Sequence, residues 1–465
     1  MEEISVCEAL IALLGIEKVL VPGSTGYNTS LSSYFSPQAA AVLPACFVTP
    51  QTVVDVSTLV KILTSSENGG PHDFAVRGGG HTWFANANSA PGAVTIDMRG
   101  LNSIEFSADK SSVSVGAGAT WDLIYDKLDP LGLSVAGGRV AGVGVGGLTL
   151  GGGISYFGPR EGLTCNQAIS FEIVLADGSV VEANEKQNAD LWWGLRGGSN
   201  NFGIVTRINF RTFEQRSLLW STLTLNPLTE PFEGETPPFY KPILELPTIS
   251  NALATTITAS MSTLAQNSVA LQKPQAARYM TATTTFIPTE AMIRATYDAF
   301  NSSFSLLEGV AGLMWAANIE PLGVLNLLLK LHYGPVSQKK IIVPNTPLPP
   351  QIYKRGGADT NALGLTKQES SLAICLISPA WSDAAHDEQV YSAARSLMSD
   401  IEEKAKKLGV YDPYIYLDYA APWQDVIKGY GEENVKMLQA LRKRVDPVGV
   451  FTRMVKGGFK IPEES

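Results

Sequence analysis

Two glycine-rich segments constrain the fold of this chain of 465 residues more than any other feature. Residues 77–81 read RGGGH and follow the apolar stretch 74–76, which predicts a strand. The second segment begins with GVGVGG at residues 142–147 and adds three more glycines at 151–153. Glycines let the backbone approach a large group closely, and their exposed N–H groups can bind a pyrophosphate. We therefore predict that a phosphate-bearing cofactor lies between the segments, where it can react with His81.

The second segment matches the GxGxxG pattern of dinucleotide-binding Rossmann domains, but only formally. A Rossmann domain needs a helix that begins at the glycines and an acidic residue about 20 positions further on. Here more glycines follow, through Gly153, and we expect no helix to begin in this segment.

For Arg77, in the first glycine segment, two roles stay open, because its side chain could face the phosphate or brace the loop.

Composition excludes several other classes of protein. The net charge is −9, and no dense cluster of Lys and Arg would follow a phosphate backbone, so we expect no nucleic-acid partner. No apolar run reaches the roughly 18 residues of a membrane span, and the acidic start of the chain does not resemble a signal peptide. None of the four cysteines has CxxC spacing, so no metal site is predicted. A bridge between Cys7 and Cys46 stays open.

Alternating and helical apolar patterns predict an α+β fold. We divide the chain into an N-terminal arm (1–40), a cofactor domain (41–213), a substrate domain (214–410) and a C-terminal segment (411–465). The predicted helices are 52–63, 120–128, 289–300, 387–408 and 432–445. The predicted strands include 45–50, 74–76, 94–98, 112–115, 169–175, 180–182, 204–210, 255–263, 277–286 and 372–377. Composition shifts at residues 225–242, and we expect a proline-rich loop at 344–350.

Several separated motifs together resemble one family. They are residues 76–81, 143–153, 190–198, 201–206, 416–419, 430–431 and 446–447. In this order they are similar to the berberine-bridge-enzyme-like FAD-linked oxidases of the vanillyl-alcohol-oxidase superfamily, in particular their fungal branch. The resemblance covers nearly the whole chain and is strongest over 41–213 and 411–453.

The resemblance implies a PCMH-type FAD-binding domain with a substrate domain, containing an antiparallel sheet, over the flavin. It implies that His81 forms a covalent bond with the C8 methyl group of the flavin. Many relatives have a second link through a cysteine, but Val140 occupies that position here. We therefore expect a single covalent link. The predicted cofactor-binding residues are Arg77, Gly78, Gly79, Gly80, His81, Thr82, Val140, Gly142, Val143, Gly144, Gly146, Gly147, Gly152, Gly153, Gly203, Ile204 and Tyr419.

By the same resemblance, the catalytic residues are Tyr419, Tyr416 and Asp418, with Tyr419 the expected base. A phenol titrates near ~10, so this role requires a lowered pKa or a concerted proton transfer. Asp418 replaces an asparagine that is usual in the family, which changes the charge near the flavin. Val143 corresponds to a gate residue whose small size is typical of oxygen-reactive members. Glu161 is either a site carboxylate or a solvated surface residue.

We thus expect an FAD-dependent oxidoreductase that takes hydride from a small organic alcohol or related C–H donor. Molecular oxygen then regenerates the flavin and yields H2O2. A secondary-metabolite substrate is preferred. Two alternatives stay open: a carbohydrate oxidase, and a cyclase or pericyclase that holds the flavin without net redox chemistry. The resemblance implies a secretory route, although this chain has no recognisable signal peptide. The sequence predicts no oligomeric state.

Overall fold

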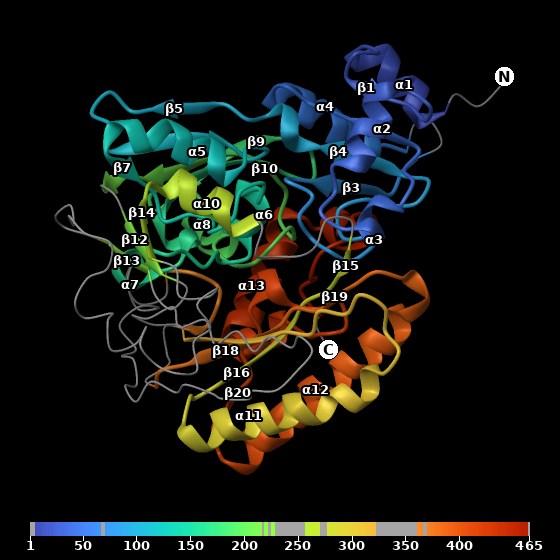
Figure 1. The fold of residues 1–465 in the computed structure, drawn as a ribbon. Coiled ribbons are helices and arrows are strands. Elements are labelled where there is room, and N and C mark those ends of the chain that lie inside the picture. The colour runs from blue at the N-terminus through green and yellow to red at the C-terminus, as the bar shows by residue number, and fades with distance from the viewer. Residues whose placement is uncertain are drawn as a thin grey trace.

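The structure, a computed structural model, describes residues 5–66, 70–215, 218–221, 225–227, 256–269, 277–321, 360–365 and 370–463. Within these residues, parallel and antiparallel sheets are flanked by helices, which confirms the predicted α+β class (Figure 1). The proline-rich loop predicted at 344–350 and most of the composition shift at 225–242 lie outside the described residues.

The sheet nearest the N-terminus carries the first glycine segment. Its order is β1-β2-β4-β3, with β2, β4 and β3 parallel and β1 antiparallel to β2. The strands are β1 (Val19–Leu20), β2 (Cys46–Val48), β3 (Phe74–Arg77) and β4 (Val94–Asp97). Helix α4 (Val53–Thr64) begins at a capping box, in which the Asp55 N–H donates to the Thr52 hydroxyl. Its apolar face packs into the same core as the strands.

A five-stranded antiparallel sheet forms the second part of the cofactor domain, in the order β5-β6-β10-β8-β9. Its strands are β5 (Ile104–Phe106), β6 (Ser112–Gly116), β8 (Ala168–Val174), β9 (Val180–Asn184) and β10 (Ile204–Arg211). The helices in this region are α5 (Trp121–Leu128), α6 (Val145–Leu150), α7 (Gly158–Glu161) and α8 (Ala189–Leu195). Trp121 and Tyr125 of α5 are fully buried in the largest apolar cluster.

A third, antiparallel sheet has the order β17-β18-β16-β20. Its strands are β16 (Ala282–Phe286), β17 (Ala317–Pro321), β18 (Ala373–Ile377) and β20 (Tyr411–Asp412). Three of its strands belong to the predicted substrate domain, and β20 belongs to the predicted C-terminal segment. Helices α11 (Glu290–Ser303) and α12 (Asp387–Lys407) lie side by side beneath this sheet (Figure 1). Buried side chains of α12 recur at helical spacing, as the sequence predicted.

The remaining elements connect these layers. They are α1 (Val6–Leu14), α2 (Thr25–Ser32), α3 (Pro37–Ala40), β7 (Leu133–Ser134), β11 (Phe213–Glu214), β12 (Leu218–Ser221), β13 (Leu225–Pro227), β14 (Thr256–Ala259), α10 (Met261–Val269), β15 (Arg278–Tyr279), β19 (Ala380–Trp381) and α13 (Glu432–Val445). A disulfide joins Cys7 of α1 to Cys46 of β2, which answers the question that the sequence left open.

The C-terminal segment returns to the cofactor domain. Leu438 and Leu441 of α13 belong to the apolar cluster of the five-stranded sheet. Further on, Phe451 and Val455 belong to the cluster of the first sheet, where the Phe451 ring meets the edge of Phe74 with centroids 6.3 Å apart. The end of the chain is therefore packed close to the strand that precedes the first glycine segment.

Two local predictions were wrong. Helix α6 begins inside the second glycine segment, where we expected none, because buried packing of Val145 and Thr149 outweighs the low helix propensity of glycine. The stretch 255–263, predicted as one strand, ends as β14 at Ala259 and continues as α10 from Met261. The buried residues of α10 recur at helical spacing, so burial of this face favours the helix.

Candidate active site

The two glycine segments touch each other through their backbones. A Cβ atom built on Gly79 would lie 2.6 Å from the backbone nitrogen of Gly144, and one on Gly144 would lie 2.4 Å from that of Gly79. Real Cβ atoms do not approach backbone atoms so closely, so any side chain at either position would push the segments apart. This contact explains why both segments need glycine where they meet.

Beside this contact the glycines border an open space. A Cβ on Gly147 would meet no atom within 4 Å, and one on Gly78 would meet only the Gly147 nitrogen at 3.9 Å. Both residues line a cavity of about 430 Å³. The predicted site residues that line this cavity are Gly78, Gly79, Gly80, His81, Thr82, Val140, Val143, Gly144, Gly146, Gly147, Gly203, Ile204, Tyr416, Asp418 and Tyr419. Sequence segments far apart in the chain therefore meet at one site.

Four predicted cofactor-binding residues do not line the cavity: Arg77, Gly142, Gly152 and Gly153. For Arg77 the structure favours the bracing role, because its buried guanidinium donates to the Ser30 carbonyl oxygen at 2.7 Å and lies 3.6 Å from the Asp97 carboxylate. The Gly142 N–H instead donates to Asp122, at 2.8 Å.

The glycines at the end of the second segment have packing roles. A Cβ on Gly153 would lie 2.4 Å from the Thr164 side chain, and one on Gly152 would contact Leu363 at 3.2 Å. Both have positive φ, which a side chain makes costly, so backbone geometry also calls for glycine here.

His81 borders the cavity with one face of its imidazole covered. The ring of Phe35 stacks on it, with centroids 4.0 Å apart and planes inclined by 20°. The backbone N–H of Phe35 donates to the carbonyl oxygen of Gly80, at 3.1 Å. Phe35, a residue of the N-terminal arm, thus helps to fix the position of His81.

Tyr419 lies between a buried cation and a buried anion. Its hydroxyl accepts a hydrogen bond from Arg139 and donates one to Glu320 Oε2, at 3.2 Å. Arg139 and Glu320 themselves form an ion pair, at 3.1 Å. Burial raises the pKa of Tyr419 well above its ordinary value, although the nearby Arg139 opposes this shift. This direction is opposite to the lowered pKa that was one of the two routes predicted for this base, so the flavin-free structure favours concerted proton transfer.

Tyr416 and Asp418 form a second polar group beside Tyr419. The Tyr416 hydroxyl donates to Asp418 Oδ2 at 2.7 Å and accepts from the Ile154 N–H at 2.8 Å. Removal from water raises the pKa of Asp418 to about 7, although the bond from Tyr416 lowers it. The rings of Tyr416 and Tyr419 meet edge to face, with centroids 4.8 Å apart. The three predicted catalytic residues thus share one wall of the cavity.

Sequence reasoning missed Arg139, Glu320, Tyr156 and Phe35, all of which line the cavity. Glu320 lies on β17, in a region without a recognisable motif, and pairs with a residue 181 positions away. Arg139 precedes Val140 directly, so its place beside the second glycine segment was the one available signal. Glu161 does not line the cavity and pairs with Arg160 at 2.6 Å, so it is not a carboxylate of this site.

In the part of the chain that the structure describes, every helix is too short or too polar to cross a lipid bilayer. No group of three or more His, Cys, Asp and Glu side chains in these residues is arranged to hold a metal ion.

Comparison with known proteins identifies the class. Residues 44–184 match a family model described as an FAD binding domain. The chain is 33% identical to the FAD-dependent monooxygenase sdcF of Emericella nidulans, over 98% of each protein. It is also 35% identical to a protein named oligopeptidase PhomG' of Diaporthe leptostromiformis, over 98% of this chain, but it spans only 37% of that longer relative.

Solved structures share the fold at low sequence identity. A glucooligosaccharide oxidase from Acremonium strictum, described with a 6-S-cysteinyl, 8α-N1-histidyl FAD, has a TM-score of 0.74 at 18% identity and covers 98% of this chain and 100% of its own. The 6-hydroxy-D-nicotine oxidase from Arthrobacter nicotinovorans has a TM-score of 0.68 at 17% identity, over 96% and 98%.

Fold and site together define an FAD-dependent oxidoreductase with a PCMH-type FAD-binding fold. The chain belongs to the same family as the fungal FAD-dependent monooxygenases, among them sdcF. It shares its fold with the solved BBE-like 1 protein of Physcomitrella patens, with a TM-score of 0.69 at 19% identity over 99% of each chain. The cavity fits this cofactor, because backbone without side chains borders open space at Gly78 and Gly147. Residues 78–81 and 144–147 would hold the FAD.

Proposed function

We propose that this enzyme oxidises a small organic alcohol, or a related C–H donor, and that molecular oxygen then accepts the electrons as H2O2. The observation that carries the proposal is the hydroxyl of Tyr419, which lies on the cavity wall between Arg139 and Glu320. Oxidation of an alcohol requires a group that removes the hydroxyl proton while hydride leaves carbon. The bound FAD supplies the hydride acceptor.

Tyr419 and Glu320 act together as the proton acceptor. Because burial keeps the phenol protonated, Tyr419 takes the substrate proton only as it passes its own proton to the Glu320 carboxylate, 3.2 Å away. The negative charge of the carboxylate passes to the substrate oxygen, from which it leaves with the hydride. Arg139 contacts both Tyr419 and Glu320 and holds them in place for the two proton transfers. This relay has no need for a phenolate in the resting enzyme.

His81 provides the single covalent attachment of the FAD. The attachment would join an imidazole nitrogen to the C8 methyl carbon, in place of one methyl C–H bond and the imidazole N–H. Molecular oxygen would be the final acceptor of the two protons and two electrons that this bond formation releases. Val140 lines the same cavity but has no sulfur, so it forms no second link. Val143 also lines the cavity, and its small side chain leaves room for oxygen.

The proposed substrate is a small molecule. Two relatives of this chain, sdcF and CTB5, are fungal FAD-dependent monooxygenases, which favours a fungal secondary metabolite as the substrate. A secretory route is favoured by the disulfide between Cys7 and Cys46, because such bonds persist in oxidising compartments.

Anaerobic mixing of the holoenzyme with benzyl, allyl and simple aliphatic alcohols, and with a cello-oligosaccharide, tests the chemistry. We expect an alcohol to bleach the oxidised flavin and oxygen to restore the colour with one H2O2 per product. If the oligosaccharide bleaches the flavin and none of the alcohols does, a carbohydrate oxidase is favoured. Product without bleaching would favour a cyclase, and oxygen incorporated into the product would favour a monooxygenase; either result contradicts the proposal.

A matched pair of variants tests the relay. Tyr419→Phe should slow flavin reduction by about 100- to 10,000-fold, the range for loss of a general base. Tyr430→Phe is the control, because this buried hydroxyl bonds to the Gly197 carbonyl oxygen and does not line the cavity. Equal rates for the two variants would remove Tyr419 from the mechanism.

A further inference from the structure

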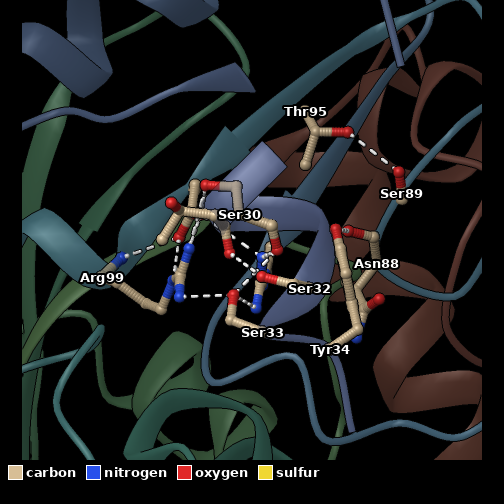
Figure 2. A network of polar contacts seen from close by, with 11 residues as sticks. Ser30, Ser32, Ser33, Tyr34, Asn88, Ser89, Thr95 and Arg99 are labelled. Atoms are coloured by element: carbon tan, nitrogen blue, oxygen red, sulfur yellow. Dashed lines mark hydrogen bonds and ion pairs between the residues drawn. The ribbon is translucent and has the colours of Figure 1, made fainter. Parts of the chain in front are cut away.

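The last residues of α2 and those that lead from it to α3 contact the loop that carries His81. This segment, residues 30–36, is called the clamp below. The Arg77 guanidinium, at the start of the loop, donates to the Ser30 carbonyl oxygen at 2.7 Å and to the Ser33 hydroxyl at 2.8 Å. Arg99 also reaches Ser33, at 2.7 Å (Figure 2). The clamp is therefore tied to the base of the loop by charge-assisted hydrogen bonds, of which the one to the Ser30 carbonyl oxygen is buried.

The clamp also contacts the loop beyond His81. The ring of Tyr34 lies 3.8 Å from the Arg77 guanidinium carbon, and its hydroxyl donates to the Asn88 carbonyl oxygen at 3.1 Å. Tyr34 and Asn88 face each other in Figure 2. The Ser36 hydroxyl donates to the Trp83 carbonyl oxygen. Contacts on both sides of His81 leave the loop little freedom to shift relative to the clamp.

Phe35 is the clamp residue that meets His81 directly. Its ring stacks on the imidazole with centroids 4.0 Å apart, while the ring of Tyr279 meets it edge-on at 5.2 Å. Tyr279 is buried on β15, in the substrate domain, so Phe35 is wedged between two fixed partners. The stack restricts rotation of the imidazole about its side-chain bonds.

We propose that Phe35 is a positioning residue that presents the His81 imidazole to the C8 methyl group of FAD for bond formation. This inference rests on the proposed attachment at His81. Reacting atoms must meet about 3–3.5 Å apart with aligned orbitals, and a displacement of ~1 Å can cost about 100-fold in rate. Phe35 carries no group that titrates, so its contribution is geometric.

The test measures attachment separately from binding. Wild type, Phe35→Ala, Phe35→Leu and Phe35→Tyr are produced in riboflavin-limited cells and supplied with FAD. Total bound flavin is read from visible absorbance, attached flavin from the colour retained after acid precipitation, and folding from thermal melts. Phe213→Ala is the matched control, because the Phe213 ring packs on Phe157 and does not line the cavity.

We expect Phe35→Ala and Phe35→Leu to attach FAD at least about 10-fold more slowly than wild type while binding as much in total. Phe35→Tyr keeps the ring and should attach FAD at a rate near that of wild type, as should Phe213→Ala. Attachment by Phe35→Leu at the wild-type rate would overturn the proposal, even if Phe35→Ala fails to fold. The proposal would also be overturned if Phe213→Ala attached FAD as slowly as Phe35→Leu. If wild type itself releases all of its flavin in acid, the covalent link at His81 is wrong, and the inference falls with it.

Discussion

The substitution Gly147→Ala should stabilise the flavin-free protein but weaken its binding of FAD. In the flavin-free protein the added Cβ would meet no atom within 4 Å, and Gly147 lies inside α6. Alanine should therefore raise the free energy of unfolding by about 0.5–1 kcal/mol, because it restricts the unfolded chain. In the complex the methyl group would occupy cofactor space. Overpacking of this kind costs about 1–3 kcal/mol, which corresponds to a dissociation constant raised about 5- to 140-fold.

The assay is titration with FAD in a His81→Ala background, where binding is reversible, combined with urea unfolding of the flavin-free protein. Gly144→Ala is the informative partner, because its Cβ would lie 2.4 Å from the Gly79 nitrogen and should destabilise even the flavin-free fold. An unchanged dissociation constant for Gly147→Ala would refute the reasoning, since the second glycine segment would then not border the bound cofactor.

Three further predictions concern stability. Glu320→Gln leaves the buried guanidinium of Arg139 without its anion and should cost about 3–5 kcal/mol in urea unfolding, much of which the apolar double variant Arg139→Met/Glu320→Leu should recover. The pKa of Asp418 is raised from 3.8 to about 7, so the folded state keeps a proton that the unfolded state loses. Unfolding free energy of the flavin-free protein should thus fall as pH rises from about 4 to about 7, and less so in Asp418→Asn. Cys7→Ser opens a disulfide that joins residues 39 apart and should lower the unfolding free energy by about 4 kcal/mol, measured against the oxidised wild type.

Local patterns were enough to predict most elements. The amphipathic helices α12 and α13 were predicted almost to the residue, because their apolar side chains recur at helical spacing. Helix α6 was not, because a glycine-rich segment has little helix propensity of its own and depends on burial of Val145. Propensity is local, whereas burial depends on which segments meet.

The same distinction applies to the site. The glycine segments, His81 and the tail tyrosines were found from motifs that are continuous in the sequence. Glu320 and Phe35 were not found, because their roles depend on partners that are distant in the chain: Glu320 pairs with Arg139, 181 residues away, and Phe35 stacks on His81. Arg77 is the opposite case: the motif predicted it as a cofactor-binding residue, but its side chain does not line the cavity and bonds to the Ser30 carbonyl oxygen instead.

The most direct test of the attachment is peptide mapping of the denatured wild-type enzyme. After acid precipitation, digestion and tandem mass spectrometry, one peptide should carry the mass of a flavin, with fragment ions that place it on His81. The peptide that contains Val140 should be unmodified. Flavin released into the supernatant, or attached to any other residue, would contradict the account.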